Sequence, residues 1–176
     1  MIRVVNIVLT FRLIPVKFSA VSMEFAVLAC RRFRAIFIRF GKVSLQLFEN
    51  GTANITGITT QEEGLYYIAG FCLKVGTSIV SWKTTSITAT AKLEYNFEKL
   101  KRHPEAEYEP ELYPAIYFTL SRCKAVVYHT GKINFVGIKC LDHVDEMFNE
   151  IKSKILDSYA FCHECSRTKV ETLDSS

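Results

Sequence analysis

An internal repeat constrains the fold of this 176-residue chain more than any other feature. Residues 33–58 align with residues 113–138 without gaps, with six identities in 26 positions. The same offset continues upstream, where it pairs Thr10 with Thr90. Chance similarity between hydrophobic strands is the alternative explanation, but chance matches rarely stay in register beyond one window. We therefore expect two tandem copies of one structural unit.

The two copies share one predicted order of elements. Residues 4–13 and 84–93 are rich in β-branched residues, which is typical of an opening strand. Gly51 and Gly131 then mark equivalent turns between later strands. Four strands per copy follow, the later ones at about 35–40, 43–48 and 52–57, and at 115–120, 123–128 and 132–137. Apolar spacing predicts helices at about 18–30, 61–75, 96–102 and 141–156.

This order predicts an α+β fold. Two tandem pseudo-symmetric repeats would join edge to edge in a curved antiparallel sheet, with the helices on one side only. The domain would span residues 1–156, with repeat one at about 4–80 and repeat two at 84–156. We expect residues 157–176 to form a flexible polar tail.

Composition excludes several classes of protein. Hydrophobic residues make up 49% and charged residues 23% of the chain, which excludes an intrinsically disordered protein. The six Cys are scattered along a chain that can build an apolar core, so we expect no disulfide scaffold and a reducing compartment. Charged residues interrupt the apolar N-terminal stretch, so we expect neither a signal peptide nor a membrane partner. A net charge of +4 is compatible with an acidic partner but is too small to predict one.

Alternation along the predicted strands separates two faces of the sheet. One face is uniformly aliphatic and suits packing against helices. The other is mixed and carries little charge; it comprises Asn6, Val8, Thr10, Gln46, Phe48, Asn54 and Thr56 in the first copy, and Ser86, Thr88, Thr90, Val126, Tyr128, Asn134 and Val136 in the second. Amides and hydroxyls can donate to the minor-groove acceptors of A·T pairs, and aromatics at strand ends can wedge between base steps. Ordinary core packing is the alternative for the aromatics.

Two segments of the second copy resemble the TATA-box-binding protein family. Residues 108–114, Tyr-Glu-Pro-Glu-Leu-Tyr-Pro, are similar to that family's YEPELFP run. Residues 128–139, Tyr-His-Thr-Gly-Lys-Ile-Asn-Phe-Val-Gly-Ile-Lys, resemble its block of the form F-x-S-G-K-x-x-x-T-G-A-K. The first copy matches more weakly, at residues 5–8, 31–33 and 47–57, and the resemblance covers about residues 4–156.

The resemblance implies a saddle whose concave sheet binds, opens and bends A/T-rich promoter DNA in the minor groove. The wedging aromatics would be Phe33, Phe48, Tyr113 and Tyr128, the groove-lining residues Asn6, Val8, Thr56 and Val126, and the residues near the DNA backbone Arg32, Arg39, Lys132 and Lys139. A loop bearing Glu109, Glu111 and Leu112 would hold a transcription factor IIB-like partner. IIA-like factors and RNA polymerase would be further partners. The resemblance implies no catalysis and no cofactor, and a location in the nucleus or at a viral transcription site.

The sequence departs from the family pattern in ways that bear on specificity. Tyr113 and Tyr128 stand where the family has phenylalanine, and a buried phenol needs a hydrogen-bond partner. Gln46, Asn54 and Asn134 replace aliphatic residues. Some family lysines are also missing. We therefore expect a changed sequence preference and a shallow salt dependence, as in a divergent homologue from a virus or an early-branching eukaryote.

Two other functions remain open at the level of sequence. A protein-interaction module could keep the saddle and lose DNA binding, and a saddle domain could be detached from a nuclease or glycosylase. No histidine belongs to a catalytic constellation. Cys162 and Cys165 have the spacing of metal ligands but no second pair nearby, so we expect a polar tail there and no metal site.

Overall fold

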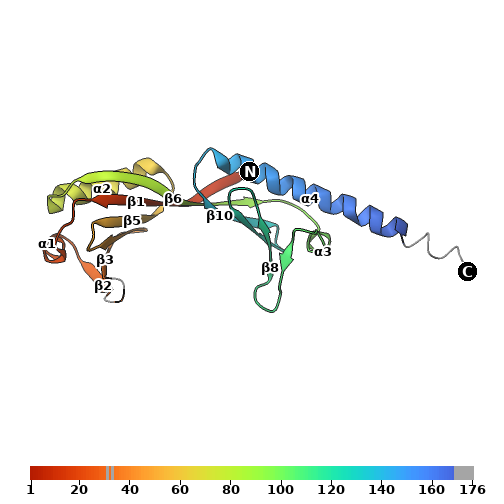
Figure 1. Ribbon diagram of the computed structural model, residues 1–176, viewed down its shortest axis with the longest axis horizontal. Helices are drawn as coiled ribbons and strands as arrows, with labels where there is room; N and C mark the ends of the chain where they lie inside the picture. The colour runs from red at the N-terminus through yellow and green to blue at the C-terminus, as the bar shows by residue number, and fades with distance from the viewer. Residues whose placement is uncertain (31, 33, 169–176) are drawn as a thin grey trace, which may run out of the picture. The chain divides into compact units, whose positions relative to one another are not determined.

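The computed structural model describes residues 1–30, 32 and 34–168, with side chains up to residue 159. The described elements repeat one order, strand–helix–four strands–helix, in each copy (Figure 1). The first copy comprises β1 (Ile2–Leu13), α1 (Phe18–Glu24), β2 (Val27–Cys30), β3 (Ala35–Phe40), β4 (Val43–Phe48), β5 (Thr52–Ile58) and α2 (Gln61–Val75). The second comprises β6 (Ile79–Lys92), α3 (Phe97–Leu100), β7 (Glu107–Tyr108), β8 (Ala115–Thr119), β9 (Lys124–Tyr128), β10 (Lys132–Ile138) and α4 (His143–Thr168).

The chain divides into two compact units that correspond to the two copies. One unit is Val4–Thr88, and the other combines Met1–Arg3 with the residues from Ala89 onward. The boundary therefore lies inside β6, later than the gap between positions 80 and 84 expected from the repeat. The start of the chain, Met1–Arg3, joins the second unit.

Each unit contains antiparallel strands in the same relative order. In the first unit the hydrogen-bonded neighbours run β2-β3-β4-β5-β1, and in the second they run β7-β8-β9-β10-β6. Each copy has five strands where four were predicted, because the short strands β2 and β7 pair with the outer edges of β3 and β8. Sequence pattern did not reveal them because they are short and lack an alternating apolar pattern.

Burial follows the alternation predicted from sequence. In β1 the side chains of Ile7, Leu9 and Phe11 are buried, whereas the even-numbered residues between them stay partly exposed. The same parity holds in β4 and β5, and at Ile87 and Ala89 of β6. In each unit the aliphatic face of the strands therefore forms the core.

Helix α2 lies along the strands of the first unit (Figure 1). Its Ile68 and Phe71 side chains are buried in the core of that unit. Its bounds agree with the prediction because both ends carry strong signals. The Thr60 side chain accepts a hydrogen bond from the Glu63 backbone N–H at 3.2 Å, and Gly76 ends the helix in the left-handed conformation at φ 67°.

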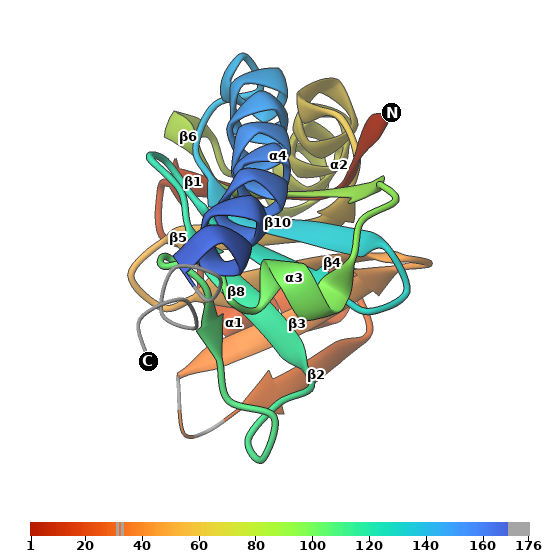
Figure 2. The ribbon, with the colours of Figure 1, turned by 90° about the vertical axis from the view of Figure 1, so that its right-hand side faces the viewer.

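Helix α4 is longer than predicted and corrects the expectation of a flexible tail for residues 157–168, while residues 169–176 of the predicted tail lie outside the described part of the chain. The helix continues to Thr168, and its residues beyond 156 still make packing contacts. The Ser158 side chain is buried, and the Tyr159 hydroxyl accepts a hydrogen bond from the Asn96 backbone N–H at 3.0 Å, beside α3 (Figure 2). A contact with a distant segment therefore supports a stretch whose composition alone looked loop-like.

The two short helices also end earlier than predicted. Helix α1 stops at Glu24 because the chain then extends to pair as β2. Helix α3 ends at Leu100, ahead of His103 and Pro104. Within the described part of the chain, no helix has the length and apolar character needed to cross a membrane.

The turn glycines of the repeat are equivalent in structure. Gly51 has φ +80° and Gly131 has φ +82°. A Cβ atom at either position would lie 2.5 Å from a backbone oxygen, that of Leu13 or of Leu93. The repeat therefore preserves a turn that only glycine fits.

Candidate nucleic-acid interface

The face predicted to be open is at least partly exposed to solvent in both copies. Of its fourteen residues, Val136 is exposed and the other thirteen are partly exposed. In the first unit a row crosses four strands through the register pairs Thr10–Asn54, Asn54–Gln46 and Gln46–Phe37. In the second unit the equivalent row reads Thr90, Asn134, Val126 and Tyr117. Each unit thus presents a surface of hydroxyls, amides, aliphatic groups and aromatic rings.

Hydrogen bonds hold the amides of this face in place. The Thr10 hydroxyl donates to Asn54 Oδ1 at 2.8 Å, and the Thr90 hydroxyl lies 3.2 Å from Asn134 Oδ1. The Asn6 side-chain oxygen accepts from the Gly57 backbone N–H at 2.8 Å. A donor oriented in advance loses less entropy when it meets a ligand.

The predicted wedge residues lie at the ends of strands. Phe48 ends β4 opposite Ala35, and Tyr128 ends β9 opposite Ala115. Both side chains are partly exposed, which argues against a purely core role. Tyr113 is 43% exposed and precedes β8. Phe33, the fourth predicted wedge, lies outside the described residues.

The two second-copy tyrosines supply the partner that a phenol needs. The hydroxyls of Tyr113 and Tyr128 lie 3.0 Å apart, and their ring centroids are 6.2 Å apart. This hydrogen bond, together with partial burial, raises the pKa of Tyr128 above its ordinary value. The Tyr95 hydroxyl donates to the Tyr128 backbone oxygen at 2.5 Å and so supports the same strand end. Sequence reasoning missed Tyr95.

The four predicted basic residues, Arg32, Arg39, Lys132 and Lys139, are all exposed. Lys132 is joined by two cations that sequence reasoning did not select, Arg3 and Lys92, which line a hollow of about 480 Å³ with it. Arg3 belongs to the first strand of the chain and Lys132 to the last, so no local pattern could reveal their proximity. The second unit therefore carries a denser basic edge than predicted.

The predicted partner-binding loop forms a small hollow of its own. Glu109 and Leu112 line a space of about 320 Å³ with Tyr113, Tyr117 and Lys124. The side chain of Leu112 is 80% exposed. Glu111, the third predicted residue, is exposed but does not line this hollow.

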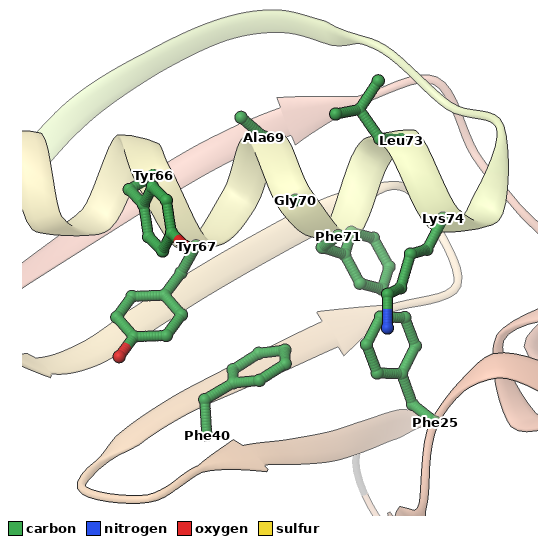
Figure 3. Close-up of a pocket in the computed structure, with 9 residues that line it drawn as sticks. All are labelled: Phe25, Phe40, Tyr66, Tyr67, Ala69, Gly70, Phe71, Leu73 and Lys74. Atoms are coloured by element: carbon green, nitrogen blue, oxygen red, sulfur yellow. The ribbon is translucent and has the colours of Figure 1, made fainter.

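A second surface, on α2, was not predicted. A pocket of about 460 Å³ lies between α2 and the rings of Phe25 and Phe40, and Figure 3 shows the side chains that line it. Tyr66 and Leu73 on its helix side are 76% and 85% exposed. The second copy has Glu146 and Ser153 at the corresponding positions, so the apolar character belongs to the first copy alone.

The described side chains include no cluster of three or more potential metal ligands. Cys30, Cys72, Cys123 and Cys140 are free thiols. Burial raises the pKa of the Cys123 thiol to about 12, which keeps it protonated and unreactive at neutral pH. Cys162 and Cys165 lie in the last part of α4, where side chains are not described.

Comparison with known proteins agrees with this geometry. The family model "Transcription factor TFIID (or TATA-binding protein, TBP)" matches residues 81–158. A TATA-box-binding protein of Methanocaldococcus jannaschii is 28% identical over 173 residues, covering 89% of this chain and 92% of its own. One of Methanococcus maripaludis is 27% identical over 165 residues, covering 85% and 91%.

A solved structure shows the same fold. The structure described as Methanococcus jannaschii TBP aligns with a TM-score of 0.79 at 23% sequence identity, covering 89% of this chain and 98% of its own. The predicted α+β class with tandem repeats is confirmed. The family match in the second copy, the archaeal relatives along most of the chain and the shared fold identify the chain as a divergent relative of the TATA-box-binding proteins.

Proposed function

We propose that the chain is a non-enzymatic transcription initiation factor that binds A/T-rich promoter DNA through the minor groove. The observation that carries the proposal is the duplicated open face, which carries little charge and on which a threonine, an asparagine and an aromatic residue recur at equivalent positions of the two copies: Thr10 and Thr90, Asn54 and Asn134, Phe48 and Tyr128. The name shared by its relatives, TATA-box-binding protein, supports the same ligand.

The chemistry of the face matches a minor groove better than a phosphate channel. A·T pairs offer only acceptors there, so side chains that donate can pair with them, and guanine adds a 2-amino group that aliphatic side chains exclude. Val8 and Val126 supply such bulk, while Asn54 and Asn134 supply amides. A phosphate channel would instead need a continuous line of cations along the face.

We further propose that the strand-end aromatics wedge between base steps and bend the duplex. The positions of Phe48 and Tyr128 at the ends of β4 and β9 support this role. Tyr128 would enter as a phenol already paired with Tyr113. Separation of the two hydroxyls would free the one O–H that this hydrogen bond uses, which could then donate to a base edge.

Partner recruitment belongs to the same proposal. The hollow lined by Glu109 and Leu112 offers an exposed apolar group beside a carboxylate, which suits a basic and apolar segment of an initiation factor IIB-like protein. Glu111 adds charge nearby. IIA-like factors and RNA polymerase are further proposed partners, at a nuclear or viral transcription site or its archaeal equivalent.

The alternative is a protein-interaction module that no longer binds DNA. The exposed apolar pocket on α2 favours it, because the polar counterpart in the second copy shows that the fold does not require such a surface (Figure 3). The two functions are compatible in one chain, and they depend on different residues.

Substitution of the wedge residues tests DNA binding. We expect Phe48→Ala and Tyr128→Ala each to weaken binding to a TATA-containing duplex by about 5- to 150-fold, since each removes about 1–3 kcal/mol of stacking. Fluorescence energy transfer between dyes at the duplex ends measures binding and bending together, at low salt. Tyr66→Ala is the matched control, because Tyr66 is an exposed aromatic on α2.

Two results would contradict the proposal. The wild-type protein could leave the duplex unbound and unbent at low salt, which would favour the interaction module. Alternatively, Tyr66→Ala could weaken binding as much as Phe48→Ala, which would place the DNA on a different surface.

A further inference from the structure

The most unusual feature of the open face is a threonine–asparagine pair that recurs in both copies. Thr10 of β1 lies opposite Asn54 of β5, and Thr90 of β6 lies beside Asn134 of β10. The related family has aliphatic residues at the two asparagine positions. The same threonine–asparagine pair therefore occurs twice, once in each copy.

The hydrogen bond determines which end of the Asn54 amide is available to a ligand. Asn54 Oδ1 can only accept, so the 2.8 Å contact uses the single hydroxyl proton of Thr10. The Thr85 hydroxyl, 2.5 Å from the Thr10 oxygen, then serves as donor to Thr10. With its oxygen held toward Thr10, the amide directs its N–H₂ group the opposite way.

We propose that the Thr10–Asn54 pair is a specificity-determining element that makes Asn54 a donor-only reader of one base pair in the minor groove. A donor pairs with adenine N3 or thymine O2 and opposes the 2-amino group of guanine, which is also a donor. The donor on Asn54 then preserves the preference for A·T pairs, at a position where the family has an aliphatic side chain. The inference rests on the proposed DNA binding and names the residues that read one position.

The second copy holds its amide by different contacts: the Thr90 hydroxyl is shared between two acceptors, and the Asn134 side chain also hydrogen-bonds Tyr128. The Thr90 hydroxyl lies 3.1 Å from the Ile133 backbone oxygen and 3.2 Å from Asn134 Oδ1, so two acceptors compete for one proton. Val126 also stands where the first copy has Gln46. Base discrimination should therefore be stronger at the position read by the first copy.

Purine analogues separate the effect of the Asn54 donor from other contributions to the binding free energy. The probe is a short duplex of A·T pairs only, in which each pair in turn is replaced by 2,6-diaminopurine·thymine, adding only the 2-amino group. Equilibrium binding is measured for the wild type, Thr10→Val and Thr10→Ser. Serine keeps the hydroxyl, and valine keeps the shape but removes the donor, so Oδ1 of Asn54 is released and can accept from the added amino group.

We expect the wild type and Thr10→Ser to lose affinity on the order of tenfold when the position read by Asn54 carries diaminopurine. For Thr10→Val, the loss of affinity caused by diaminopurine should largely disappear at this position and should remain at the other positions. Asn54→Asp, which presents only acceptors, is the second variant and should bind the diaminopurine duplex in preference to the A·T duplex. Thermal unfolding confirms that each variant is folded.

Identical penalty profiles for Thr10→Val and Thr10→Ser would overturn the inference while DNA binding stands. The same holds if Asn54→Asp keeps the wild-type preference. Failure of the wild type to bind any duplex would overturn the proposed function, and the inference with it.

Discussion

At the scale of single residues, substitutions that depart from the family pattern acquire partners within their own unit. Tyr113 and Tyr128 replace two phenylalanines, and their hydroxyls lie within hydrogen-bond distance of each other. Tyr95 in turn donates to the Tyr128 backbone. The polar atoms that a Phe-to-Tyr change introduces are thus satisfied inside the second unit.

Tyr95 predicts a loss of stability at high pH. Burial raises the pKa of Tyr95 from 10 to about 12, so the folded state favours the neutral phenol. The associated stability is complete below pH 10 and is lost as the pH rises from 10 toward 12. Urea unfolding at several pH values should show this decline.

Tyr95→Phe is the control for that titration. It removes the hydrogen bond to Tyr128, at a cost of about 1 kcal/mol at neutral pH, and should make the alkaline decline shallower. Cys72, Cys123 and Tyr128 also have raised pKa values and contribute to the remaining slope. An unchanged alkaline profile in Tyr95→Phe would show that Tyr95 ionises like an exposed tyrosine.

At the scale of elements, α2 shows how far a helix can be predicted from its ends. Glycine is costly inside a helix, yet α2 contains Gly64 and Gly70. The first is buried, and a Cβ there would lie 2.5 Å from Leu9 Cδ1 and 2.7 Å from Ile58 Cδ1. The second has nothing within 4 Å and borders the apolar pocket.

These two glycines predict opposite effects of the same substitution. Gly64→Ala should destabilise the protein by about 1–3 kcal/mol, because the methyl group must displace Leu9 and Ile58. Gly70→Ala should stabilise it by up to about 1 kcal/mol through helix propensity. Chemical denaturation of both variants measures the difference. Stabilisation by Gly64→Ala would mean that α2 does not pack closely on β1.

Only part of the candidate site could be predicted at this scale. The alternation along β1, β4 and β5 assigned Asn54 and Phe48 to the open face, because a strand has a fixed period of two. The cations Arg3 and Lys92 were missed, since they meet Lys132 only through the fold. The extension of α4 was missed for a similar reason, as its packing involves Asn96.

At the scale of the whole molecule, duplication and a small net charge are the main constraints on function. A net charge of +4 in a DNA-binding chain implies few phosphate contacts. Under the proposed function, shape, hydrogen bonding and wedging would then supply much of the affinity. Specificity for the minor-groove edge would follow from such a balance.

Salt dependence tests this balance. With Arg32, Arg39, Lys132 and Lys139 neutralising one phosphate each, the logarithm of the binding constant should fall with the logarithm of salt concentration with a slope of about −3.6. Lys132→Gln should make the slope shallower by roughly 0.9. The exposed Lys74 of α2 provides the control, and Lys74→Gln should leave the slope unchanged. Equal effects of the two substitutions would place the DNA elsewhere.

The order of residues was by itself sufficient to determine the duplication, the α+β class and the parity that separates a core face from an open face. These are local or periodic properties, and a periodic pattern can be read directly from the amino-acid sequence. Only the tertiary structure decided that Thr10 holds the Asn54 amide, that Tyr113 pairs with Tyr128 and that α4 continues past residue 156. Each depends on segments that are distant in sequence and fold close together. Hydrogen bonds between such segments produce no periodic pattern in the sequence.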